Sequence, residues 1–452
     1  MLANRLADNF YGITNDYRDP ATSILTFSTT VLHGVPASML RNLLIGCSML
    51  LVTSSLGAEN WPGWRGPQGI GTSAETGFPV KWSTTENIRW QAPLPGPGNS
   101  TPVVWEDRIF VTCAAAEGKQ RSLICFDRNS GKQRWQKSVA FAAAEVTHKT
   151  NPQCASSPVT DGKQVVAWFG SAGLYAYDME GKLLWKRDLG KFEHVWGTAS
   201  SPIIFEDLVI VNCGPGLRAF WIALDKRTGR DVWRWEPPEA KSSKLDEFRG
   251  SWSTPVIDGS GDKALMFLSM PTRLYAVAPR TGKVRWSCGG LSKLIYTSPL
   301  VTKDTVMVMC GYHGPSLAVR RGGQGDVTTS HRLWLLEDRQ ANPQRVGSGV
   351  IVGDHVYILN ETGIAWCLEL KTGKKLWEQR LGKAKSWSSM CYVEGRLYIV
   401  NMDGVSFVLE PNPTSCKILA ENQLDGLTRG SLAFSQGLIF VRTYKQLICI
   451  GN

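Results

Sequence analysis

The chain has 452 residues, of which 43% are hydrophobic and 20% are charged, and it carries a formal net charge of +11. This composition excludes a disordered or low-complexity chain, and the length allows two or three domains or one large all-β domain. The counts of 18 tryptophans and 45 glycines are unusual and indicate repeated β-strands joined by tight turns.

The first 58 residues carry the features of an export signal behind an extension. Residues 1–38 lack a basic cluster and apolar periodicity, so we interpret them as an extension or a mis-called start, with Met39 as the true start. The apolar run Leu43–Val52 follows Arg41 and precedes small residues, which predicts a signal peptide at residues 39–58. The alternative is a buried core segment. We expect an exported protein of the periplasm or cell envelope, without a lipid on Cys47 and without a transmembrane segment.

The remaining chain divides into a predicted N-terminal capping segment at residues 59–86 and a repeat region at residues 87–452. Each repeat begins with a small residue, which is usually followed by a proline and then by a β-branched or apolar residue. Five clear copies and three degenerate ones begin at Ser100, Ser157, Ser201, Thr254, Ser298, Ser348, Ser389 and Ser431. Apolar and polar residues alternate with period two within each copy, as in half-buried antiparallel strands.

A tryptophan closes most of the repeats. It recurs at intervals of 43 to 53 residues, at Trp90, Trp135, Trp185, Trp233, Trp286, Trp334 and Trp377. A turn with Asp and Gly, such as Asp127–Lys132, precedes it. These two residues suit a tight turn, because Asp can bond the backbone of its own turn and Gly accepts a positive φ. We expect these tryptophans to pack between neighbouring repeats rather than to bind a ligand.

Four strands in each repeat predict an all-β fold, an eight-bladed β-propeller of four-stranded antiparallel blades. The last repeat supplies only three strands, and residues 87–91 supply a lone fourth strand. We therefore predict that residues 87–91 pair with the strand near Leu447–Ile450 and close the ring, which leaves no open sheet edge.

The repeats resemble the pyrroloquinoline quinone (PQQ)-like β-propeller family over residues 61–452. The motifs Trp61–Pro67 and Gly322–Thr328, the latter interrupting blade five, are similar to those of its exported bacterial, non-catalytic branch. The resemblance implies one of two functions. Relatives such as outer-membrane protein assembly factor B are scaffolds, whereas quinoprotein dehydrogenases bind PQQ and calcium on the propeller axis.

The residues do not carry the chemistry of the dehydrogenases. The adjacent cysteine pair of those enzymes is missing from the sequence. The loop carboxylates Glu145, Asp246, Glu247 and Asp425 match no catalytic motif. The six histidines lack metal-ligand spacing, and we expect those in predicted loops to be solvated: His148, His194 and His313. We predict no catalytic residue, no metal site and no cofactor, with PQQ and calcium as the alternative.

Most cysteines recur at equivalent strand positions in different blades, too far apart for a disulfide. We expect six to be unpaired and buried: Cys113, Cys125, Cys213, Cys310, Cys367 and Cys449. The pairing of the other four in the repeat region stays open: Cys154, Cys288, Cys391 and Cys416.

The candidate site is a ring of residues just before each first strand, which a propeller gathers around the mouth of its axial channel. Its predicted members are Asn99, Asn151, Trp196, Trp252, Tyr296, Arg345, Trp387 and Arg429. Arginine favours anionic groups, and aromatic rings favour sugar faces or apolar side chains. The alternative is that the aromatic residues pack under long loops. We predict a monomeric, non-catalytic scaffold that binds a protein or glycan partner in this funnel, without nucleic-acid binding. The alternative function is a PQQ-dependent dehydrogenase.

Overall fold

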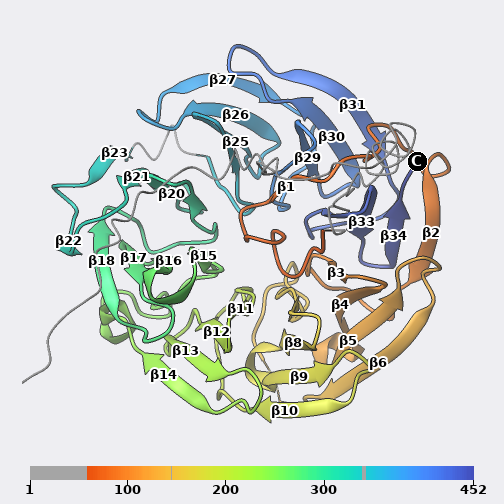
Figure 1. Cartoon of the computed structure of the whole chain (residues 1–452), viewed down its shortest axis with the longest axis horizontal. Helices are drawn as coiled ribbons and strands as arrows, with labels where there is room; N and C mark the ends of the chain where they lie inside the picture. Colours follow the sequence, from red (N-terminus) through yellow and green to blue (C-terminus); the bar gives the residue numbers. More distant parts are fainter. Residues whose placement is uncertain (1–58, 144, 338–342) are drawn as a thin grey trace, which may run out of the picture. The chain divides into compact units, whose positions relative to one another are not determined.

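The computed structural model describes residues 59–143, 145–337 and 343–452, so the predicted extension and signal peptide lie outside the described residues. Eight sheets follow one another around a common axis, which confirms the predicted eight-bladed propeller (Figure 1). The described residues contain no α-helix, and none of their helical turns is long and apolar enough to cross a membrane. These short 3₁₀ turns are η2 (Ala116–Gly118), η3 (Gly170–Ala172), η4 (Pro238–Lys241) and η5 (Gly261–Lys263).

Each blade is an antiparallel sheet whose first strand is innermost and whose fourth is outermost. Blades one to four contain β3 (Val103–Trp105), β4 (Arg108–Ala115), β5 (Gln120–Asp127) and β6 (Gln133–Ala140); β7 (Val159–Thr160), β8 (Gln164–Trp168), β9 (Leu174–Asp178) and β10 (Leu183–Arg187); β11 (Ile203–Phe205), β12 (Leu208–Cys213), β13 (Phe220–Asp225) and β14 (Asp231–Trp235); and β15 (Val256–Asp258), β16 (Leu265–Met270), β17 (Arg273–Val277) and β18 (Val284–Gly289).

The remaining blades repeat this order with additions from the N-terminus. Blades five to eight contain β19 (Leu300–Val301), β20 (Thr305–Met309), β21 (Ser316–Arg320) and β23 (Arg332–Leu336); β24 (Val350–Val352), β25 (His355–Leu359), β26 (Ile364–Glu369) and β27 (Lys375–Arg380); β28 (Cys391–Val393), β29 (Arg396–Val400), β30 (Val405–Glu410) and β31 (Lys417–Gln423); and β32 (Ala433–Ser435), β33 (Leu438–Arg442), β34 (Gln446–Ile450) and β2 (Ile88–Pro93).

Blade eight joins the two ends of the repeat region. Strand β2 pairs antiparallel with β34, with Ile88 opposite Ile450 and Trp90 opposite Cys449. This pairing confirms the predicted ring closure. It also removes the free edge that β34 would otherwise present to other chains.

A closed circle of hydroxyl groups links the innermost strands. In each blade one backbone N–H donates to the hydroxyl oxygen of the equivalent residue in the next blade, over 2.9–3.2 Å. The eight members are Thr101, Ser157, Ser201, Thr254, Ser298, Ser348, Ser389 and Ser431. We call this circle the hydroxyl ring. Its bonds define which residues of the eight blades are structurally equivalent.

The closing tryptophans lie between neighbouring blades, as predicted. Six of them donate their indole N–H to a turn carbonyl of the next blade over 2.8–3.0 Å: Trp90, Trp135, Trp185, Trp233, Trp334 and Trp377. A turn glycine lies beneath the ring where a side chain would collide. A Cβ on Gly229, for example, would come within 2.8 Å of Trp185. Glycine is therefore required at this turn both by its φ of +69° and by the close approach of the ring.

Trp286 is the exception among these tryptophans. It is 1% exposed, yet its indole N–H has no hydrogen-bond partner among the described residues. The insertion Gly322–Thr328 replaces the short turn of blade five, and its strand β22 (Gly325–Asp326) pairs with β18 of blade four. The insertion thus interrupts blade five in sequence but extends blade four in space.

Residues 59–86 connect the inner parts of several blades. The N–H and carbonyl of Trp61 both bond to Val104 of blade one over 2.9 Å. Strand β1 (Thr72–Ser73) pairs in parallel with β28 of blade seven. Between these two contacts the buried guanidinium of Arg65 donates to the carbonyls of Gly349 (2.6 Å) and Ser348 (3.3 Å) in blade six.

All ten cysteines in the described residues are free thiols, which confirms the six predicted to be unpaired. The four undecided ones, Cys154, Cys288, Cys391 and Cys416, are free as well. Burial raises the thiol pKa, to about 12 for Cys154 and for Cys391. Because the thiolate is the reactive form, these side chains are expected to be inert in the folded protein.

Thiol titration tests this assignment. Without reductant, the folded protein should react slowly, and denaturant should release all ten thiols of the described residues at once. The same protein reduced beforehand provides the reference count. A difference of two or more thiols between the untreated and the reduced sample would reveal a disulfide and contradict the assignment.

Candidate functional site

A cavity of about 400 Å³ lies on the axis where the innermost strands begin. We call it the axial pocket. Every blade contributes to it the residue two positions before its member of the hydroxyl ring. These eight residues are Asn99, Ala155, Ala199, Trp252, Tyr296, Val346, Trp387 and Arg429. Residues two apart in an extended chain point to the same side, so each of these eight side chains lies on the same side of its chain segment as the hydroxyl-ring residue that follows it.

The structure brings seven of the eight predicted site residues to this pocket, and it corrects their register. Asn151 and Trp196 line the pocket from the loops before blades two and three, where Ala155 and Ala199 occupy the equivalent positions. Arg345 does not line it, because an odd offset of three from Ser348 turns its side chain the other way.

The side chain of Arg345 is instead buried within the blades. It is 1% exposed, and its guanidinium lies 5.4 Å from the ring centre of Trp366. Its Nη1 donates to the hydroxyl of Ser316 over 3.1 Å. The prediction that Arg345 belongs to the funnel is therefore not supported by its position.

One side of the pocket is an aromatic wall formed by Trp196, Trp252 and Tyr296. Their ring centres lie 5.0–6.1 Å apart, with tilted or edge-to-face geometry. The indole N–H of Trp252 donates to the carbonyl of Gly197 over 2.8 Å, which fixes the ring. Burial and the negative charge of Glu361 raise the pKa of the Tyr296 hydroxyl, so it stays protonated.

His194 supports this wall from behind, and the prediction that it is solvated is wrong. Its side chain is 3% exposed and contacts Trp252 edge-on, with ring centres 4.8 Å apart. Its Nδ1 accepts the backbone N–H of Trp196 over 3.0 Å, and burial lowers its pKa to about 4. The other two loop histidines, His148 and His313, are exposed as predicted.

The opposite side of the pocket is a polar wall built around Glu361, Lys385 and Trp387. The carboxylate of Glu361 accepts the indole N–H of Trp387 over 3.1 Å and lies 3.4 Å from the ammonium group of Lys385. The Glu361 side chain is 7% exposed, whereas that of Lys385 is 64% exposed. The acid is thus fixed within the wall, and the lysine remains accessible.

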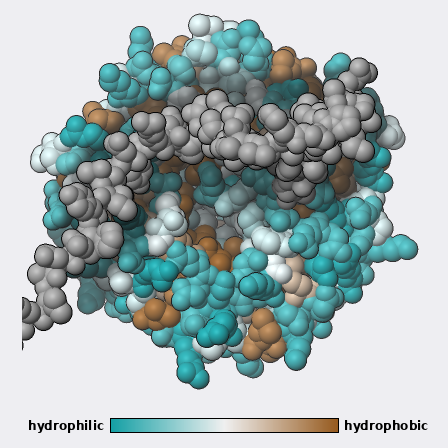
Figure 2. Space-filling model, viewed as in Figure 1, coloured by the Kyte–Doolittle hydropathy of each residue, from teal (hydrophilic) through white to brown (hydrophobic). Residues whose placement is uncertain are grey.

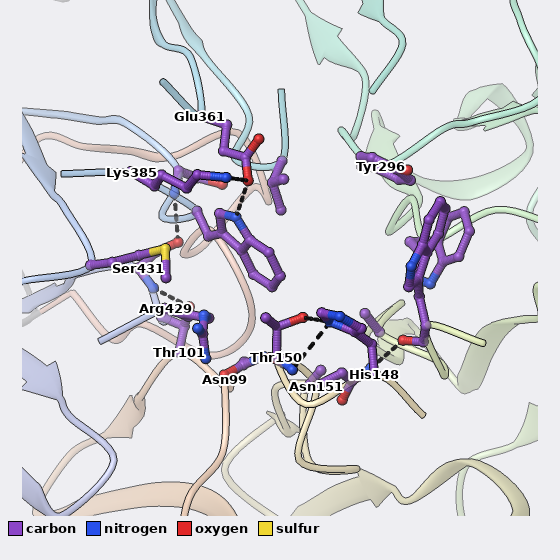
Figure 3. A pocket seen from close by; sticks show the side chains of 18 of the residues that line it. Asn99, Thr101, His148, Thr150, Asn151, Tyr296, Glu361, Lys385, Arg429 and Ser431 are labelled. Carbon is purple, nitrogen blue, oxygen red and sulfur yellow. Dashed lines mark hydrogen bonds and ion pairs between the residues drawn. The ribbon is translucent and has the colours of Figure 1, made fainter. Parts of the chain in front are cut away.

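Arg429 completes the polar wall. Its guanidinium lies 5.0 Å from the ring centre of Trp387 and 5.3 Å from that of Tyr444. It donates to the hydroxyl of Tyr444, which in turn donates to Asn99 over 3.1 Å. Arg429 and Lys385 lie across the cavity from Tyr296 (Figure 3).

The pocket also has a hydroxyl-lined part. Five members of the hydroxyl ring line the cavity: Thr101, Ser201, Thr254, Ser389 and Ser431. Their oxygens already accept a backbone N–H, so each O–H proton remains available to a ligand acceptor. Trp64 adds an indole from the segment at residues 59–86.

The lining of the pocket does not supply the usual ligand set of a calcium ion. Calcium takes six to eight oxygen ligands, several of them carboxylates. Glu361 is the single acidic residue of the pocket lining, and its carboxylate is committed to Trp387 and Lys385. In the described part of the chain, no group of three or more His, Cys, Asp or Glu side chains is arranged to hold a metal ion.

The carboxylates considered from the sequence lie elsewhere. Glu145 pairs with Arg121 and accepts the hydroxyl of Ser171 over 2.6 Å, and Asp246, Glu247 and Asp425 are not part of the pocket lining.

Sequence reasoning missed several lining residues that come from loops within or between blades and, in the case of Trp64, from the segment at residues 59–86. These are Trp64, His148, Thr150, Tyr312, Gln344, Glu361, Lys385 and Met402. Some of these positions are equivalent between blades: the N–H of Glu361 donates to the carbonyl of Gln344 in the same way as the N–H of Met402 donates to that of Lys385. The sequence analysis considered one position before each first strand, and these residues lie outside it. The three missed equivalents, Ala155, Ala199 and Val346, were marked in the sequence by the Ser that follows two residues later.

Known proteins resemble this chain in sequence. The family model described as outer membrane protein assembly factor BamB matches residues 73–220 and 218–450. The chain is also 24% identical over 396 residues to a 1-butanol dehydrogenase (quinone) from Thauera butanivorans. That match covers 80% of this chain and 58% of the relative, so the chain spans less than two thirds of the enzyme's length.

Solved structures resemble the chain in fold. BamB from Moraxella catarrhalis superposes with a TM-score of 0.57 at 17% identity, covering 81% of this chain and 97% of that one. A europium-containing methanol dehydrogenase superposes with a TM-score of 0.61 at 13% identity, covering 87% of this chain and 89% of that one. At these identities the likeness establishes the fold and not the activity.

Proposed function

The chain belongs to the PQQ-like β-propeller family of outer membrane protein assembly factor BamB, and from this premise we propose that it is an exported, non-catalytic scaffold that binds a protein or glycan ligand in its axial pocket. The predicted signal peptide and the family support export to the periplasm or cell envelope. The observation that carries the binding role is the pocket itself, because all eight blades direct equivalent residues into it.

The pocket favours a small ligand or the end of a longer one. Its volume of about 400 Å³ lies within the range of small-molecule sites, which is roughly 300–1,000 Å³. On the face shown in Figure 2, hydrophilic side chains dominate and apolar side chains are scattered in small groups. On this face, a partner would therefore meet small apolar groups rather than a broad apolar patch.

The second candidate is a PQQ-dependent dehydrogenase. It is favoured by the similarity to a quinone-dependent 1-butanol dehydrogenase. The composition of the axial pocket opposes it, since Glu361 is the single acidic residue there and is already engaged by Trp387 and Lys385.

Arrays of defined glycans and of peptides, together with a titration of PQQ and calcium, test the proposal. We expect at least one glycan or peptide on the arrays to bind the protein. Its affinity should fall at least tenfold in Trp196→Ala and in Lys385→Ala. Both side chains are partly or largely exposed, so stability should change little. Lys132→Ala is the matched control, because Lys132 is an exposed turn residue outside the pocket.

Two results would reject the proposal. One is binding that Trp196→Ala and Lys385→Ala leave unchanged. The other is saturable binding of PQQ with calcium that these variants weaken, combined with quinone-dependent oxidation of an alcohol, which would establish the dehydrogenase.

A further inference from the structure

We propose that the axial pocket recognises an acidic sugar, with the carboxylate of a uronic acid at Arg429 and the sugar ring against the aromatic wall. This inference rests on the proposed binding function and names the chemical class of its ligand. It is carried by three features of the pocket: a fixed arginine without a counter-ion, an excess of hydrogen-bond donors, and an aromatic surface opposite the charge.

Arg429 is held in place but has unused binding capacity. The rings of Trp387 and Tyr444 flank its guanidinium, and one Nη1 donor bonds to the Tyr444 hydroxyl. Its Nε is buried, so a ligand would meet the terminal Nη atoms, and no acidic side chain of the described residues forms an ion pair with the guanidinium. A guanidinium in this state is suited to a carboxylate, which it can bind through two parallel hydrogen bonds.

The charges of the pocket also favour an anion. Its lining contains the cations Lys385 and Arg429 and the single acid Glu361. Because Glu361 is nearly buried and lies beside Lys385, its charge is largely compensated within the wall. A ligand carboxylate at Arg429 would therefore meet a net positive field, which a low-dielectric pocket strengthens.

The hydroxyl ring selects for a ligand rich in acceptor oxygens. Its members already receive a backbone N–H, so they offer O–H donors to whatever enters the pocket. The hydroxyl and carboxylate oxygens of a uronic acid supply such acceptors. Across the cavity, the indoles of Trp196 and Trp252 line the pocket, and the C–H side of a sugar ring can pack against such an aromatic surface.

An acidic peptide fits the same pocket less well. A bound peptide commonly adds a strand to a free sheet edge, where unpaired N–H groups supply its hydrogen bonds. At the top of the inner strands, the N–H groups of the ring residues are already donated to the hydroxyls of the next blade. The pocket thus offers side-chain donors rather than a backbone edge.

Calorimetric titration with trisaccharides that end in galacturonate, glucuronate or mannuronate tests the inference. The matched ligands are the methyl esters of the same sugars, which keep the shape and remove the charge. We expect at least one acid to bind ten times more tightly than its ester, and the difference to shrink as salt is added. Arg429→Gln should abolish this difference, and Arg429→Lys should retain part of it because the charge remains.

Lys385→Ala is a second variant that tests the inference if the Arg429 variants fail to fold. Its side chain is 64% exposed, so the fold should persist, and the preference for the acid should fall about threefold. Lys132→Ala should leave the preference unchanged.

Three outcomes would overturn the inference. Equal binding of acids and esters would overturn the preference for a carboxylate, and Arg429-dependent binding of acidic peptides alone would overturn the sugar class; in both cases the proposed function stands. Absence of binding by all saccharides and peptides would overturn both.

Discussion

Replacing Arg65 by methionine should destabilise the propeller by about 2–6 kcal/mol, since each buried acceptor left without a partner costs roughly 1–3 kcal/mol. The guanidinium is 1% exposed and donates to the carbonyls of Ile70 (2.5 Å) and Gly349 (2.6 Å), with longer contacts to Ser348 and Met390. These bonds join the segment at residues 59–86 to blades six and seven. Methionine fills similar space but supplies no donor.

Urea unfolding of the purified chain measures this loss. Arg89→Met is the matched control, because Arg89 is exposed on β2 in the same N-terminal region. Arg65→Lys should recover part of the stability, since an ammonium group can still donate to two or three carbonyls. A decrease below 1 kcal/mol in Arg65→Met would mean that the carbonyls find other partners and that the segment is not fastened by this side chain.

The fold could be predicted because each blade repeats the same contact between a tryptophan and a turn glycine. A closing tryptophan must cover the turn glycine of the next blade, so both residues recur at nearly fixed intervals and are visible in the sequence. Ring closure followed from simple complementarity, since the last repeat lacked the strand that the N-terminus supplied. Trp286 shows the limit of this reasoning. It keeps its place in the repeat, but an insertion in the neighbouring blade removes its hydrogen-bond acceptor.

The site was less predictable, because it depends on exact register and on loops. A shift of one residue turns an extended side chain to the opposite side, and this is why Arg345 is buried between blades whereas Val346 lines the pocket. The Ser or Thr of the hydroxyl ring fixes the register, but its role is evident only from the bonds between blades. Glu361 follows the second strand of blade six and Lys385 precedes the first strand of blade seven, so their meeting with Trp387 depends on the packing of these two neighbouring blades.

Acidification should weaken the fold through His194, because burial lowers its pKa from 6.5 to about 4. The unfolded state then binds more protons than the folded state between these two pH values, so stability falls as the pH drops from about 6.5 towards 4. The shift corresponds to a loss on the order of 3 kcal/mol, at 1.36 kcal/mol per pKa unit. Protonation would also place a proton on the Nδ1 that accepts the Trp196 N–H and would put a charge among aromatic rings.

Urea unfolding at pH 7.0 and at pH 4.5, compared between the parent and His194→Gln, isolates this contribution. The glutamine amide oxygen can still accept the Trp196 N–H but does not titrate, so the variant should lose some packing at pH 7.0 and show a smaller decrease on acidification. His313→Gln controls for histidine removal as such, because His313 is exposed. Equal pH dependence in the parent and in His194→Gln would show that other groups govern acid stability. The position of the aromatic wall would then not depend on the protonation of His194, and a ligand that stacks on it should bind equally well at pH 5 and pH 7.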